Sequence, residues 1–179
     1  EMTNVPFIIA GPGIHPRQKP VEDLLTQPTI DLLPTLCELA GIPVPSSKPG
    51  ISLAPFLKGE KQKRQHPYAA SEWHSEYEVT VSPGRMIRSP RYKYTHYLEG
   101  NGEELYDMLK DKGERRNLAH DPKYSKILAE HRALLDDYIR RTQDDYRSLK
   151  VEADKRWRSH APGYPNHEGP CARDIINRK

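Results

Sequence analysis

Cysteine is scarce in this sequence: Cys37 and Cys171 are the two among 179 residues. Cysteines so far apart define no disulfide framework, and neither lies in the Cys-x-x-Cys or Cys/His spacing of a zinc site. Whether the two form a disulfide is left open. Long apolar runs are also absent, so we expect no membrane partner, and no stretch near the start resembles a signal peptide.

A strong excess of charge of one sign is lacking too. The chain has 28 Lys and Arg against 25 Asp and Glu, a net charge of +3 that tolerates an anionic partner without requiring one. The basic run from Lys58 to Arg64 has no interleaved aromatic residues, so we predict a solvated loop and no nucleic-acid partner. Only 35% of the residues are apolar, but they cluster, as they do in folded chains.

The first third of the chain combines a strand signal with a helix signal. The apolar run Val5–Ala10 ends in Gly-Pro-Gly and predicts a buried strand of a parallel sheet. Because a lone strand cannot pair its own backbone groups, we expect this strand to belong to a larger sheet in a longer protein. A helix is predicted over Thr29–Gly41, capped by Asp31 and with Pro34 in its first turn, and residues 42–65 are predicted to form a surface connection. The predicted apolar face of the helix consists of Leu32, Leu33, Leu36, Leu39 and Ala40.

The middle of the chain is rich in strand signals. Short segments alternate with turns such as Ser82-Pro83-Gly84, which predicts sequential strands paired antiparallel. Asp121 and Pro122 then begin a long helix, whose apolar residues recur every three or four positions as far as Ile139 and would cover the sheet. Beyond Thr142 we expect a polar tail that is loosely packed or disordered. The predicted strands span residues 68–73, 77–81, 85–88, 92–98 and 104–108.

Four segments of the chain carry short motifs in a fixed order. They are Val5–Gly13; Asp31-Leu32-Leu33-Pro34-Thr35-Leu36 with Leu39-Ala40-Gly41-Ile42; Gly50–Gly59; and Arg88–Tyr94 followed by Glu104-Leu105-Tyr106-Asp107, Glu114 and Asn117-Leu118-Ala119. Together, over roughly residues 5–140, they resemble the C-terminal half of the sulfatase family, within the alkaline-phosphatase-like fold. The stretch Ser71-Glu72-Trp73-His74 is also similar to the heparan N-sulfatase branch of that family.

This resemblance implies an α/β fold class with three parts. Residues 1–66 would end the catalytic α/β domain, residues 67–142 would form a C-terminal subdomain of an antiparallel sheet and a long helix, and residues 143–179 would form the polar tail. The parent would be a sulfuric ester hydrolase that acts on sulfate esters or N-sulfates of a sulfated glycan, such as a glycosaminoglycan. Sulfatases of this kind work in the periplasm, outside the cell or in lysosomes, and we expect one of these locations.

Sulfatases of this family use a formylglycine, made from Cys or Ser in a C/S-x-P-x-R motif, and a calcium ion. No such motif occurs here, because Glu-Leu-Ala-Gly follows Cys37, Ala-Arg-Asp-Ile follows Cys171, and Ser47-Lys48-Pro49 is followed by Gly-Ile. We therefore predict no catalytic and no metal-binding residue in this chain. We also predict that the chain alone has no sulfatase activity and that it depends on an N-terminal catalytic domain as its partner.

In the family, the C-terminal subdomain shapes the rim of the substrate cleft. Arginine suits sulfated or carboxylated sugars, because its planar fork binds oxyanions bidentately. Histidines in loops are further candidates. Each candidate also has a structural alternative: a surface histidine, an arginine paired with glutamate on a strand, or a hydrogen-bonded packing histidine. The candidate substrate-binding residues are His74, Arg85, Arg88, His96 and His15.

Two other functions stay open at this point. The chain could be a stand-alone, non-catalytic module that binds glycans or serves as a scaffold. It could also be part of a related phosphodiesterase or phosphonate hydrolase, because a shared fold does not identify the nucleophile.

Overall fold

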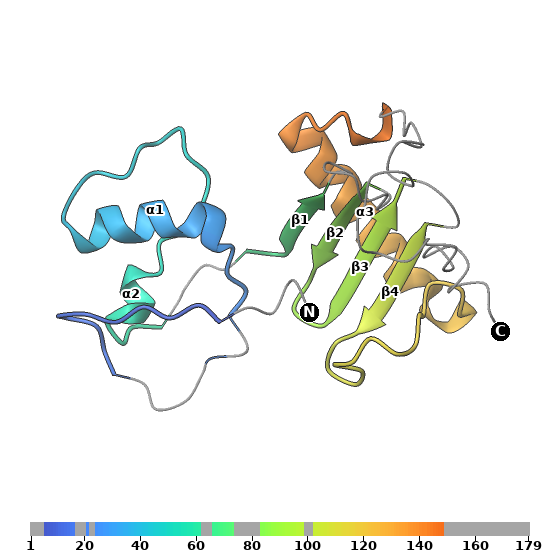
Figure 1. Cartoon of the computed structure of the whole chain (residues 1–179), viewed down its shortest axis with the longest axis horizontal. Helices are drawn as coiled ribbons and strands as arrows, with labels where there is room; N and C mark the ends of the chain where they lie inside the picture. The colour runs from blue at the N-terminus through green and yellow to red at the C-terminus, as the bar shows by residue number, and fades with distance from the viewer. Residues whose placement is uncertain are drawn as a thin grey trace, which may run out of the picture. The chain divides into compact units, whose positions relative to one another are not determined.

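The computed structural model describes residues 6–16, 21, 24–61, 66–73, 83–98 and 102–148. The chain divides into two compact units: unit 1 comprises Glu1–Ser71 and Arg88–Tyr92, and unit 2 comprises Glu72–Ile87 and Lys93–Lys179. The α-helices and β-strands of both are labelled in Figure 1. In the described part of the chain, no helix is long and apolar enough to cross a membrane. The three-part division predicted from the sulfatase resemblance stays a prediction.

Helix α1 of unit 1 spans Pro28–Leu39, close to the predicted helix. Pro28 occupies the start of the helix, where its missing N–H costs nothing. Asp31 does not precede the helix as the predicted cap. It lies in the first turn, where its Oδ2 accepts a hydrogen bond from the Gln27 N–H at 2.7 Å. Pro34 lies in the helix interior and not in the first turn.

Two buried side chains of α1 hold the segment that leads to helix α2 (Ala54–Leu57). Asp31 Oδ1 accepts from the Ile51 N–H at 2.8 Å, and Thr35 Oγ1 accepts from the Leu53 N–H at 2.9 Å. Both N–H groups would otherwise be left unpaired in a partly buried segment, which costs free energy. The motifs around Asp31 and around Ile51 therefore occur together because one supplies the hydrogen-bond acceptors for the other.

Gly50 is required where this segment meets α1. Its φ is +120°, and a Cβ at this position would lie 2.1 Å from the carbonyl oxygen of Ile30. Pro34 stands four residues after Ile30 and has no N–H to donate to that carbonyl. The loop backbone therefore approaches α1 at the point where the helix ladder is interrupted.

The predicted β-block forms one four-stranded sheet in the order β1-β2-β3-β4. Consecutive strands are neighbours, and Figure 1 shows their arrows alternating, as in an antiparallel meander. The predicted strand over 77–81 lies outside the described residues. The strands are β1 (Ala69–Trp73), β2 (Gly84–Arg88), β3 (Tyr92–Tyr97) and β4 (Glu103–Asp107).

Helix α3 (Ser125–Thr142) lies against one face of the sheet in Figure 1, as predicted. A 3₁₀ turn, η1 (Pro122–Tyr124), leads into it, and Asp121 caps this turn by accepting from the Lys123 N–H at 3.1 Å. The apolar stripe of α3 buries Leu128 and Leu135. Buried residues from the strands complete the core of unit 2: Met86, Ile87, Tyr94, Leu105 and Tyr106.

Three observations differ from the expectations. The described residues 6–10 of the predicted strand Val5–Ala10 form no strand, because no described strand pairs with them. The leucine face predicted for α1 is exposed at Leu32, Leu33 and Leu36. The first residues of the predicted tail are packed, because the 3₁₀ turn η2 (Tyr146–Ser148) buries Tyr146 completely.

Candidate functional site

The predicted substrate-binding residues fall into different parts of the chain. His15 and Arg88 belong to unit 1, and Arg85 and His96 belong to unit 2. His74 lies outside the described residues. The structure therefore brings two of the five candidates into one compact body, and both of these contact Tyr146.

Arg85 is buried on strand β2, with 1% of its side chain exposed. Its Nε and Nη2 donate to the two carboxylate oxygens of Asp144 at 2.6 and 2.9 Å, and its guanidinium carbon lies 4.4 Å from the centre of the Tyr146 ring. Burial alone lowers the pKa of Arg85, but the hydrogen bond and the charge of Asp144 outweigh it, and the pKa is raised. A substrate would reach this guanidinium only if the turn that carries Asp144 opened.

His96 lies near the end of strand β3 and is half-buried. Its Nδ1 is 2.9 Å from the Tyr146 hydroxyl oxygen, and the two rings meet edge to face. Burial is the main cause that lowers the pKa of His96, and the charges of Arg147 and Arg132 lower it further. Glu103 and Asp136 act in the opposite direction. Near neutral pH the imidazole is therefore uncharged.

Arg85, His96, Asp144 and Tyr146 together form what we call the Tyr146 cluster. Sequence reasoning missed Asp144 and Tyr146, because both follow the residue at which the apolar pattern of the long helix fades. A buried tyrosine needs a hydrogen-bond partner for its hydroxyl, so an isolated Tyr in a polar tail was the available signal. Burial raises the pKa of Tyr146 to about 12, so the phenol keeps its proton.

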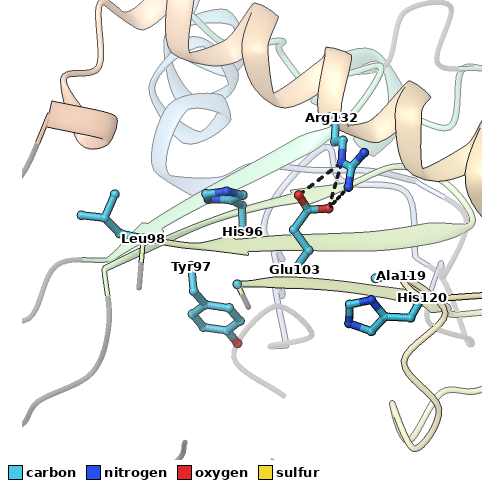
Figure 2. A pocket seen from close by; sticks show the side chains of 8 residues that line it. His96, Tyr97, Leu98, Glu103, Ala119, His120 and Arg132 are labelled. Atoms are coloured by element: carbon cyan, nitrogen blue, oxygen red, sulfur yellow. Dashed lines mark hydrogen bonds and ion pairs between the residues drawn. The ribbon is translucent and has the colours of Figure 1, made fainter. Parts of the chain in front are cut away.

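A hollow of about 310 Å³ opens beside His96, between the end of β3, the start of β4 and α3. Figure 2 shows His96 and Glu103 on the side of the sheet that faces Arg132, while Tyr97 points to the other side. Arg132 donates from Nε and Nη2 to the Glu103 carboxylate at 2.9 and 2.8 Å. The residues around the hollow are His96, Tyr97, Leu98, Gly102, Glu103, Ala119, His120 and Arg132.

The two candidates of unit 1 have simpler surroundings. Arg88 is half-exposed at the end of β2 and donates from Nη1 to the carbonyl oxygen of Ser89. His15 is exposed, its N–H donates to the Leu57 carbonyl at 2.7 Å, and its ring lies against Gly59. Both residues therefore lie apart from the Tyr146 contacts that Arg85 and His96 share.

Within the described ranges, no group of three or more His, Cys, Asp or Glu side chains is placed to hold a metal ion. The most buried carboxylate of unit 1, Asp31, is already used by the N–H groups of Gln27 and Ile51 and by His66 Nε2 at 2.7 Å. The described side chains therefore do not fit a calcium site. The hollow of unit 2 is instead lined by polar side chains that can form hydrogen bonds with a ligand.

Comparisons with known proteins agree on one family. Residues 1–141 match the family described as N-sulphoglucosamine sulphohydrolase, C-terminal. The chain is 76% identical over 179 residues to a Delta 4,5-hexuronate-2-O-sulfatase of Bacteroides thetaiotaomicron. The match covers 100% of this chain and only 37% of that protein.

Two solved structures extend this result. A 2-O GAG sulfatase has a TM-score of 0.78 and 76% identity, and the match covers 93% of this chain and 36% of that one. A second structure, in complex with its substrate D-glucosamine-2-N,6-O-disulfate, has a TM-score of 0.59 and 27% identity, and the match covers 67% of this chain and 25% of the other. The aligned regions are thus between 25% and 37% of each relative's length.

Proposed function

Because the chain belongs to the sulfatase family, as a C-terminal portion of such an enzyme with the alkaline-phosphatase-like fold, we propose that its parent hydrolyses the 2-O-sulfate ester of a Δ4,5-unsaturated hexuronate. The glycan would be a fragment of a glycosaminoglycan. The observation that carries this proposal is the 76% identity over the whole chain to a Delta 4,5-hexuronate-2-O-sulfatase. That match covers 37% of the relative's length, so the substrate of the parent is tested by assay below.

We propose that this portion helps to form the rim of the substrate cleft and supplies no nucleophile. Formylglycine and calcium, which the family uses, would be held by residues of the parent outside this chain, where they supply the nucleophile and polarise the sulfate. In support, the sequence contains no C/S-x-P-x-R motif, and the described residues offer no metal-ligand cluster. A location in the periplasm, outside the cell or in lysosomes stays a prediction, and cell fractionation tests it.

Of the predicted substrate contacts, the structure favours His96, which lines the hollow. Arg85 sits in the interior of unit 2, and its guanidinium is engaged by Asp144. Arg88, His15 and His74 stay predictions.

Sulfate release by the full-length parent tests the proposed function. The substrates are an unsaturated disaccharide sulfated at the 2-position of its hexuronate, the isomer sulfated only at the 6-position of its hexosamine, and a phosphonate monoester. We expect turnover of the first alone. Turnover of the phosphonate at a comparable rate, or of the 6-O-sulfated isomer alone, would contradict the proposal.

A second assay tests the role of this portion. The 179-residue chain alone, given the same disaccharide, should release no sulfate. Measurable release by the chain alone would place a nucleophile within it.

A further inference from the structure

We propose that Tyr146 fixes His96 as the Nδ1–H tautomer, so that its Nε2 accepts a hydrogen bond from a sugar hydroxyl, and not from a sulfate, in the hollow beside strand β3. The inference rests on the proposed function for the identity of the glycan, and on the geometry of the Tyr146 cluster for everything else.

The tautomer follows from the contacts of the Tyr146 hydroxyl. Its oxygen lies 2.9 Å from the carbonyl oxygen of His96 and 2.9 Å from His96 Nδ1, with the Pro83 carbonyl oxygen farther away at 3.4 Å. Carbonyl oxygens only accept, and two oxygens at 2.9 Å need a proton between them. The single hydroxyl hydrogen therefore goes to the His96 carbonyl. Nδ1 must then carry a hydrogen and donate it to the Tyr146 oxygen.

This arrangement leaves Nε2 as the acceptor of the ring. In the described part of the chain Nε2 has no hydrogen-bond partner, and no buried polar side-chain atom there lacks one. Nε2 is therefore reached by solvent, at a residue that lines the hollow. A ligand that enters the hollow meets an acceptor held in a fixed direction.

The charges around His96 decide what kind of ligand group suits it. Glu103 of β4 and Asp136 of α3 favour the charged ring, Arg132 of α3 and Arg147 of η2 oppose it, and burial opposes it most strongly. A neutral ring presents a lone pair at Nε2, and a lone pair repels a sulfate or carboxylate oxygen. A hydroxyl has a hydrogen to donate, so the hollow selects sugar hydroxyls at this position.

Tyr146 is a positioning residue in this proposal, because it acts through His96. Its ring packs against the guanidinium of Arg85, which donates two hydrogen bonds to Asp144. The backbone N–H of Tyr146 also donates to Asp144 Oδ1 at 3.1 Å. The buried ion pair thus anchors the tyrosine that orients the histidine.

Two substitutions of His96 in the full-length parent separate its two nitrogens. His96→Asn keeps a donor near the position of Nδ1 but has nothing at Nε2, while His96→Gln carries its amide oxygen near the position of Nε2. On the 2-O-sulfated unsaturated disaccharide, we expect His96→Asn to raise KM about three- to tenfold, the effect of one neutral hydrogen bond. His96→Gln should restore KM to within about twofold. With 4-nitrophenyl sulfate, which has no sugar hydroxyl, neither variant should change KM.

Three results would overturn the proposal: an unchanged KM of His96→Asn on the disaccharide, an equal rise on both substrates, or no rescue by glutamine. If the wild type does not hydrolyse the disaccharide, the proposed function fails, and the tautomer is then tested alone. The parent is labelled with ¹³C and ¹⁵N in its histidine rings, and His96→Asn identifies the His96 signals.

The ring carbon shifts at about pH 8 report which nitrogen carries the hydrogen. We expect the Nδ1–H signature in the wild type and a shift toward the Nε2–H signature in Tyr146→Phe, which keeps the ring and loses the hydroxyl. An Nε2–H signature in the wild type overturns the proposal, whether or not Tyr146→Phe folds.

Discussion

Unit 1 and unit 2 differ in how they bury apolar side chains. Among the residues that the structure describes, twelve apolar residues are buried, nine of them in unit 2 and three in unit 1. In the same described ranges, eight large apolar residues are exposed, and seven of them lie in unit 1. Unit 2 has a core of its own, whereas the order in unit 1 depends on backbone N–H groups that donate to the buried side chains of Asp31 and Thr35.

The comparison indicates that the two units contribute to folding in different ways. A sheet covered by a helix removes apolar surface from water, which is the main favourable term in folding. A single helix with exposed leucines removes less, so we expect the stability of unit 1 to depend on contacts in the parent protein. Four changes test this contrast, and they are ordered by the size of the effect expected.

Loss of the ion pair between Arg85 and Asp144 should lower the free energy of unfolding more than the other changes. Arg85→Met removes the guanidinium that pairs with Asp144, whose side chain is 9% exposed. Removing one member of a buried pair costs about 3–5 kcal/mol, because the remaining charge stays desolvated. Chemical denaturation of the full-length parent measures the loss, and Arg140→Met, at an exposed pair with Asp137, should change the free energy of unfolding by less than about 0.5 kcal/mol. Equal effects of the two substitutions would show that burial of the pair is unimportant.

The loop contact of unit 1 comes second. Gly50→Ala places a Cβ 2.1 Å from the Ile30 carbonyl at a φ of +120°, so the loop must move away from α1. We expect a loss of about 2–4 kcal/mol from overpacking and backbone strain together. Gly41→Ala is the matched control: its φ is +70° and nothing lies within 4 Å, so strain alone should cost about 1 kcal/mol. Thermal or chemical unfolding measures both losses. If the two substitutions cost the same free energy of unfolding, the close approach of residue 50 to the Ile30 carbonyl does not contribute.

The pH dependence of unit 2 follows from His96. Its pKa in the folded protein lies below the ordinary value of 6.5, mainly because of burial. The unfolded chain therefore binds more protons as the pH falls below about 6.5, and the free energy of unfolding decreases until the lowered pKa is reached. Denaturation of the parent at about pH 7.5 and about pH 5 should show this decrease, and His96→Asn should show a smaller one. An identical decrease in the variant would assign the effect to other groups.

The sequence predicted most elements of the fold, because their signals are local. The strand signals between turns identified β3, the apolar periodicity as far as Ile139 identified α3, and the family motifs identified the sulfatase portion. The N-cap role of Asp31 was wrong, since its carboxylate serves N–H groups at Gln27 and at Ile51, and the second partner is distant in sequence. Distance in sequence also hid the Tyr146 cluster, because nothing local to Tyr146 indicates that it binds His96.

Substitution of an exposed leucine of α1 should have the smallest effect on the stability of the 179-residue chain, and a larger effect in the full-length parent. Leu36 is 51% exposed, so Leu36→Gln should change the unfolding free energy of the 179-residue chain by less than about 0.5 kcal/mol. It should also reduce the binding of a hydrophobic dye, because the chain presents this face to solvent. In the full-length parent the same substitution should cost more, since we propose that the remaining part of the enzyme covers the face. Leu109→Gln, at an exposed position of unit 2, is the control and should behave alike in both proteins. If Leu36→Gln is as harmless in the parent as in the chain, then α1 is a surface helix, and unit 1 is held by the hydrogen bonds of Asp31 and Thr35 alone.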